Sequence, residues 1–168
     1  GTASLHGLTN VDDVLALIPF AKYYGKYSQM SGGSQHTGSA GAGAIAFTTE
    51  NNDDFGVINI ATSATKISIP SPLNGRKVKF YWKGNMFVQG YTYGTDTTVT
   101  LKKNGSVVQT IAKLTAGSGD GDTVSMDAMH YSLPLVVASG DYYEVYATTT
   151  GTASSVSAGS IFGMEIIA

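Results

Sequence analysis

Apolar and polar side chains alternate repeatedly from residue 46 to the end of this chain. In the clearest stretch, Lys77–Lys83, a period of two puts Val78, Phe80 and Trp82 on one face and the lysines on the other. No helical pattern separates the alternating stretches, so the order disfavours a parallel α/β sheet and predicts an all-β antiparallel sandwich or jelly roll. Similar stretches cover residues 55–60, 64–69, 86–93, 97–110, 126–137, 142–148 and 160–167.

Short turn signals divide these stretches. Asn104–Gly105 lies between two alternating runs, and Asn-Gly is the preferred pair for a tight type I′ hairpin turn. Gly84–Asn85 and Ser139–Asp141 are predicted to be further turns.

The composition agrees with a small β domain. The chain has 168 residues, which fits one domain, and only 13% of them are charged, against about 25% in typical soluble domains. The net charge of −2 gives no electrostatic signal for nucleic acid binding. No apolar run approaches the roughly 20 residues of a membrane-spanning helix. With no cysteine, the chain has no disulfide, thiolate zinc site or cysteine nucleophile.

The first 45 residues read differently from the rest. Leu8–Ala21 is the one good helix candidate, with apolar residues at helical spacing and Asp12 and Asp13 in its first turn. A tyrosine-rich arm and a glycine-rich loop follow. We therefore predict a lead-in over residues 1–45, which carries this short helix, and a jelly-roll domain over residues 46–168.

Few residues have the types and the spacing in sequence that catalysis or metal binding requires. His6, His36 and His130 lack the spacing of a zinc site. Asp120 and Asp122 suit either a turn or a cation loop, and both interpretations stay open. The chain has no Gly-x-Ser-x-Gly elbow. We expect no catalytic centre, no bound metal and no cofactor.

Aromatic residues give a more positive signal. Tyr91 and Tyr93 share one strand face beside glycines and Asp96. Tyrosine rings near a carboxylate suit sugar stacking and hydroxyl hydrogen bonds. These three residues are candidate glycan-binding residues, with ordinary strand aromatics as the alternative. The acidic run over residues 51–54 is predicted to be a solvated loop.

Three segments resemble the trimeric jelly-roll heads of the C1q/TNF-like superfamily, in the order in which that superfamily has them. The first is residues 101–106 (LKKNGS), similar to a strand with an Asn-Gly turn. The second is residues 133–146 (LPLVVASGDYYEVY), similar to a strand–turn–strand. The third is residues 160–167 (SIFGMEII), similar to the closing strand.

The lead-in adds a second resemblance. Residues 3–14 (ASLHGLTNVDDV) look like segments of bacteriophage tail fibres and tailspikes, which often end in trimeric knobs of this kind. Together the resemblances imply an adhesion knob of a phage fibre, spike or needle, outside the cell on the virion. It would be a homotrimer that binds host cell-surface glycan. The alternatives are a purely structural trimerisation cap, or a secreted or spore-surface bacterial C1q-like protein.

The resemblance also implies an interface between copies. Period two sends Tyr143 and Val145 into the sandwich and leaves Tyr142, Glu144 and Tyr146 on the opposite face of their strand. The resemblance places that face towards the neighbouring chains, so these three residues are candidate interface residues.

Overall fold

The protein folds into two packed β-sheets. The computed structural model describes residue 23 and residues 25–38, 41–90, 96–115, 122–150 and 153–167. The elements are β1 (Tyr27–Gly38), β2 (Gly41–Ala44), β3 (Thr49–Asp53), β4 (Ile67–Ser68), the short 3-10 helix η2 (Ser71–Leu73), β5 (Lys77–Gly90), β6 (Asp96–Lys103), β7 (Ser106–Thr115), β8 (Asp122–Tyr131), β9 (Leu135–Val136), β10 (Tyr142–Thr149) and β11 (Ala153–Ile166).

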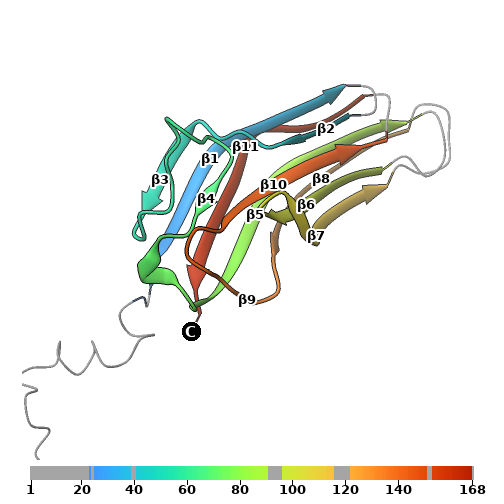
Figure 1. Cartoon of the computed structure of the whole chain (residues 1–168). Coiled ribbons are helices and arrows are strands. Elements are labelled where there is room, and N and C mark those ends of the chain that lie inside the picture. Colours follow the sequence, from blue (N-terminus) through green and yellow to red (C-terminus); the bar gives the residue numbers. More distant parts are fainter. Residues whose placement is uncertain are drawn as a thin grey trace, which may run out of the picture.

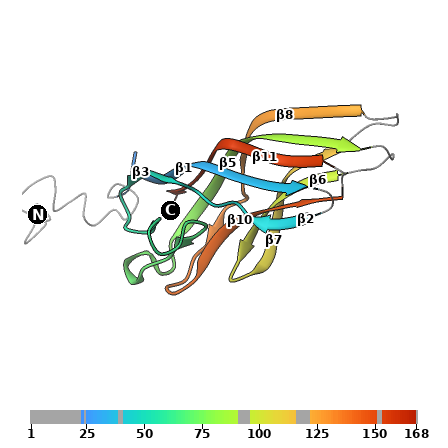
Figure 2. The ribbon, with the colours of Figure 1, turned by 90° about the horizontal axis from the view of Figure 1, so that it is seen from above.

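The strand order is that of a jelly roll. One sheet has the order β3-β1-β11-β5-β8, with β9 beside β5, and the other has the order β2-β10-β6-β7, with β4 beside β10. The eight main strands are β1, β2, β5, β6, β7, β8, β10 and β11. They pair antiparallel from the outside of the sequence inwards: β1 with β11, β2 with β10, β5 with β8 and β6 with β7. That is a folded ribbon rolled into two sheets. Figure 2 shows the two sheets as separate layers. The expected all-β antiparallel jelly-roll sandwich is confirmed.

The two ends of the sandwich differ. At one end of the sandwich β1, β5, β7 and β10 finish and β2, β6, β8 and β11 begin (Figure 1). We call this the loop end. Tyr27 pairs with Glu165 at the opposite end, where β1 starts and β11 finishes, and the β6–β7 turn also lies there. We call this the entry end.

The core lies between the layers and is aromatic. The Phe162 ring stacks 6.0 Å from Phe47 and 5.9 Å from Phe80, and Phe80 stacks 4.3 Å from Tyr143. All four rings are almost fully buried, as is Trp82. The inward face predicted for Lys77–Lys83 is confirmed.

The sandwich begins before the boundary predicted at residue 46. β1 and β2 are integral strands, paired with β11 and β10, so residues 27–38 and 41–44 belong to the jelly roll and not to the lead-in. Because glycine is depleted from strands in general, the glycine-rich sequence of β1 and β2 predicts a loop instead of strands. Gly33 is needed here, since a Cβ at this position would overlap the Phe47 ring and Ile45. The predicted Leu8–Ala21 helix lies outside the described residues.

The strand predicted over residues 55–60 does not form. The Asp53 carboxylate accepts hydrogen bonds from the backbone N–H groups of Val57 (3.0 Å) and Ile58 (3.0 Å) and from the Ser28 hydroxyl (2.7 Å). A side chain that takes backbone donors competes with a strand ladder. In place of a strand, this segment forms an isolated antiparallel β-bridge between Ile58 and Ile67.

Two further predictions were wrong. Gly84–Asn85 is not a turn, because β5 runs unbroken through it; at Gly84 a Cβ would overlap the Trp82 ring and the Ser160 hydroxyl. The strand predicted over residues 126–137 is divided into β8 and β9, and Pro134 lies in the gap. Proline cannot donate to a ladder, so it ends the pairing there.

Candidate functional site

A tyrosine-lined hollow occupies the outer face of the six-stranded sheet near the entry end. Its walls include Tyr27, Tyr81, Met129, Tyr131 and Glu165. Tyr27, Met129 and Tyr131 are 42%, 47% and 51% exposed, which is high for large apolar side chains. We call these five residues the tyrosine face.

Tyr81 forms the floor of the hollow because Gly163 lies opposite it on β11. A Cβ at Gly163 would overlap the Tyr81 ring, so the glycine lets that ring lie over the backbone of β11. The Tyr81 hydroxyl donates a hydrogen bond to Gln29 Oε1 at 3.2 Å. Burial, the largest cause, raises the pKa of this hydroxyl well above its usual value, which keeps it protonated.

A second apolar surface lies along the neighbouring edge of the sandwich. Val107 and Val108 on β7 are 61% and 39% exposed. Leu133, between β8 and β9, is 69% exposed, and Val136 on β9 is 66% exposed. The Leu133 N–H donates to Gln109 Oε1 at 2.9 Å, which brings the two groups together. We call these four residues the apolar edge. Of the residues that the structure describes, the tyrosine face and the apolar edge hold all of the exposed large hydrophobic side chains.

The predicted interface residues lie on the other sheet. Tyr143 and Val145 of β10 are buried in the core, as period two required. Tyr142 and Tyr146 are half-buried on the outer face of the five-stranded sheet, with Glu144 between them. The structure of a single chain does not test their predicted use as a contact between copies.

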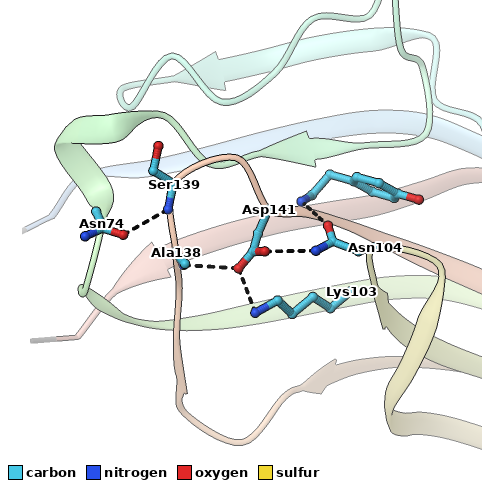
Figure 3. A network of polar contacts seen from close by, with 7 residues as sticks. Asn74, Lys103, Asn104, Ala138, Ser139 and Asp141 are labelled. Carbon is cyan, nitrogen blue, oxygen red and sulfur yellow. Dashed lines mark hydrogen bonds and ion pairs between the residues drawn. The ribbon is translucent and has the colours of Figure 1, made fainter.

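A polar network fixes the start of β10 (Figure 3). Asp141 accepts hydrogen bonds from the Asn104 side chain at 2.9 Å and from the Ala138 N–H at 3.2 Å, and it pairs with Lys103 at 2.7 Å. The Asn104 side chain in turn accepts from the Tyr142 N–H at 2.9 Å. The hydrogen bonds from Lys103 and Asn104 hold the pKa of the Asp141 carboxyl below its usual value.

The same network contains the predicted hairpin turn. Asn104 and Gly105 have φ values of 50° and 82°, the two positive values of a type I′ turn, so this prediction is confirmed.

Of the three candidate glycan residues, the structure places Asp96. Tyr91 and Tyr93 lie outside the described residues. Asp96 starts β6 at the loop end, where its carboxylate pairs with Lys113 at 2.8 Å and accepts from the Thr115 hydroxyl at 2.6 Å. These hydrogen bonds, that from Lys113 first, lower the pKa of the Asp96 carboxyl. Its contacts therefore join β6 to β7, and a role towards a sugar stays a prediction.

The histidines are not brought together. His130 stacks on Trp82 with the ring centroids 6.0 Å apart, and its Nε2 is buried without a hydrogen-bond partner. His6 and Asp120 lie outside the described residues, while the backbones of His36 and Asp122 fall in β1 and β8. Within the described ranges, no group of three or more His, Asp or Glu side chains could hold a metal ion.

No helix in the described part of the chain has the length and apolar character needed to cross a membrane.

Comparison with known proteins found similar chains among solved structures. A scan of protein-family models and a search of curated proteins both found no match. Among solved structures, the chain is similar to Eiger TNF from S. frugiperda, with a TM-score of 0.45, 11% identity, and coverage of 84% of this chain and 92% of that one. Murine APRIL at pH 5.0 gives a TM-score of 0.43 and 7% identity over 83% and 99% of the two chains. The structure of murine APRIL at pH 8.5 gives a TM-score of 0.43 and 9% identity, again over 83% of this chain and 99% of that one.

The fold is an antiparallel jelly roll. The likeness concerns the fold alone, and the strand order establishes that fold independently of these scores. The sequence signal that could have revealed the tyrosine face is its alternation: Met129 and Tyr131 on β8, and Tyr81 on β5, all fall on the outer face of the sheet.

Proposed function

We propose that this chain forms a homotrimeric knob that ends a phage tail fibre, spike or needle and binds host cell-surface glycan. One observation supports the assembly of several copies. The exposed large apolar side chains of the described residues fall on two different, adjacent sides of the sandwich, the tyrosine face and the apolar edge. Clustered apolar surface of this kind marks sites of protein association.

Two different surfaces favour a ring over a two-fold dimer. A two-fold contact uses the same patch on both copies, whereas a contact between unlike patches repeats from copy to copy and closes into a ring. Leu133 follows directly after β8, and Tyr131 on β8 belongs to the tyrosine face. The apolar edge of one copy therefore lies beside its own tyrosine face and is free to enter the hollow of the next copy.

The β10 surface is the alternative interface. Its rings are less available, because the Lys66 ammonium lies 4.0 Å from the Tyr142 ring centroid and the Lys102 ammonium lies 3.2 Å from that of Tyr146. Exposed large apolar side chains are confined to the other two surfaces within the described residues, which favours the tyrosine face and the apolar edge.

The polarity of the domain supports a role in binding. Residues 1–22 come before β1 in the sequence, and β1 begins at the entry end, whereas β1, β5, β7 and β10 finish at the loop end (Figure 1). In a fibre that continues from the lead-in, the loop end is the end presented to a host. The connection from β5 to β6 contains Tyr91 and Tyr93, the candidate glycan residues. The phage setting rests on the resemblance of residues 3–14, and the role is one of binding without catalysis.

The test combines assembly with cell binding. Leu133→Asp puts a charge into the proposed contact, and we expect sedimentation to show dissociated chains at micromolar concentration. Ala61→Asp, at an exposed turn position away from both surfaces, is the matched control and should leave the mass unchanged. Tyr142→Ala with Tyr146→Ala should leave it unchanged too.

Each outcome decides one part of the proposal. An assembled Leu133→Asp variant would remove the apolar edge from the interface, and dissociation of the double tyrosine variant would move the interface to β10. Fluorescently labelled protein should bind intact host cells and lose that binding after enzymatic removal of surface polysaccharide. An assembled protein that binds no cells would favour the structural trimerisation cap.

A further inference from the structure

The outer face of β10 carries a buried carboxylate between two tyrosines. Tyr142, Glu144 and Tyr146 follow one another at every second residue, which spaces them about 7 Å apart along the strand. Glu144 is only 9% exposed, whereas both rings remain half-buried. The carboxylate is therefore recessed between the two rings.

Among the residues that the structure describes, Glu144 has no hydrogen-bond or ion-pair partner, although buried charges are ordinarily paired. The two ion pairs of the described residues are Lys103 with Asp141 and Lys113 with Asp96. The carboxylate oxygens are not among the fully buried atoms without a partner, which are Trp82 Nε1 and His130 Nε2. They therefore keep contact with solvent and can accept hydrogen bonds from a ligand.

One ammonium group lies over each of the two flanking rings. Lys66 lies over the Tyr142 ring and Lys102 over the Tyr146 ring, and neither ammonium forms an ion pair with another residue that the structure describes. Lys102 is also the cross-strand partner of Glu144 on β6. Each ammonium therefore has hydrogen-bond donors to offer outward, and the two positive charges disfavour a cationic ligand.

We propose that this surface is a saccharide-binding site. Glu144 accepts hydrogen bonds from sugar hydroxyls, and Lys66 and Lys102 donate to hydroxyl or acidic oxygens of the sugar. The parts of the Tyr142 and Tyr146 rings that these lysines leave open contact the C–H groups of the sugar. A sugar offers hydroxyl donors, acceptor oxygens and apolar C–H faces together, which matches this set of groups. The ligand class is that of the proposed function, on which this inference rests, but the site is distinct from Tyr91 and Tyr93.

The site is held in place before binding. The backbone of Tyr142 is fixed by Asn104 within the Asp141 network (Figure 3). β10 lies between β2 and β6 in the five-stranded sheet, so the surface sits on a rigid element. It belongs to the sheet opposite the tyrosine face, so a trimer formed through that face and the apolar edge leaves it open.

The experiment measures binding on a printed array of defined neutral and acidic oligosaccharides. We expect the full chain to bind a subset of them, Glu144→Gln to weaken that binding at least tenfold, and Tyr146→Ala to weaken it similarly. The matched control is Glu50→Gln, which makes the same change at an exposed position on β3. Because Glu144 has no partner to lose, the urea midpoint of Glu144→Gln should equal or exceed that of the parent.

The outcomes separate this site from the proposed function. Array binding that survives Glu144→Gln would overturn the site and leave glycan binding elsewhere, for example at the loop end. A silent array with intact binding to host cells would overturn the saccharide site and keep the adhesion knob. A lowered urea midpoint for Glu144→Gln would show a structural role for the carboxylate and would also overturn the inference. Loss of both array and cell binding in the parent would remove both proposals.

Discussion

The closing strand offers the sharpest test of the core. Phe162 is 0% exposed, and its ring stacks between those of Phe47 and Phe80, so Phe162→Ala removes both ring contacts and leaves a cavity. Large-to-small changes of buried phenylalanine cost about 3–5 kcal/mol, and stacked rings add about 0.5–1.5 kcal/mol per pair beyond burial. We expect the loss at the upper end, about 4–5 kcal/mol. For a chain of this length that lowers the melting temperature by roughly 8–20 °C.

A matched variant makes this prediction specific. Phe55 is only partly buried and has one edge-to-face contact, with Tyr23 at 5.9 Å. Phe55→Ala should therefore cost at least about 2 kcal/mol less than Phe162→Ala. Guanidinium titrations at one protein concentration give both values, since unfolding of an assembly depends on concentration. A loss below about 1 kcal/mol for Phe162→Ala would refute the inward face of β11.

Three other changes test local features. Gly105→Val forces a β-branched residue to the φ of 82° and should cost about 1–3 kcal/mol in a thermal melt, with an unchanged assembled mass; an unchanged melting point would contradict the type I′ turn. The pKa of Asp141 is lowered in the fold, so its contribution to stability is present above about pH 4 and is lost as the pH falls further; Asp141→Asn should flatten the loss of stability between about pH 4 and pH 2, and an unchanged slope would argue against the Lys103 contact. Gly163→Val should cost about 1–3 kcal/mol by overlap with the Tyr81 ring, and adding Tyr81→Ala should restore part of that loss; additive losses would contradict the contact.

The regular parts of the fold were readable from the sequence. Period two placed Val78, Phe80 and Trp82 inward because one face of β5 is buried along its described length. The Asn104–Gly105 pair fixed its turn because few other residues tolerate two successive positive φ values. Both features are local, so pattern alone determines them.

Features set by distant partners were not readable. Gly33 and Gly84 resemble loop residues in sequence, yet a Cβ at Gly33 would meet the Phe47 ring and one at Gly84 would meet the Ser160 hydroxyl, both on other segments. The Asp53 carboxylate accepts a hydrogen bond from the Ser28 hydroxyl of β1, a contact that the sequence around Asp53 does not reveal. The pairing between these segments exists only in the folded chain.

The candidate surfaces, too, were predictable from the sequence only in part. Alternation placed Tyr142, Glu144 and Tyr146 on the face of their strand opposite Tyr143 and Val145, which the structure buries in the core. It could not show that β10 belongs to the five-stranded sheet, that lysines lie over both rings, or that Leu133 is exposed in the gap between β8 and β9. Those facts depend on sheet topology.

The mass of the parent chain in solution tests the central claim most directly. Sedimentation equilibrium at micromolar concentration should give about three times the chain mass of 17.5 kDa. Because the proposed contact is mainly apolar, this mass should persist when the salt concentration rises from about 0.1 M to 1 M, a range over which exposed ionic contacts are screened. A mass of a single chain at every concentration would contradict the trimer and with it the knob.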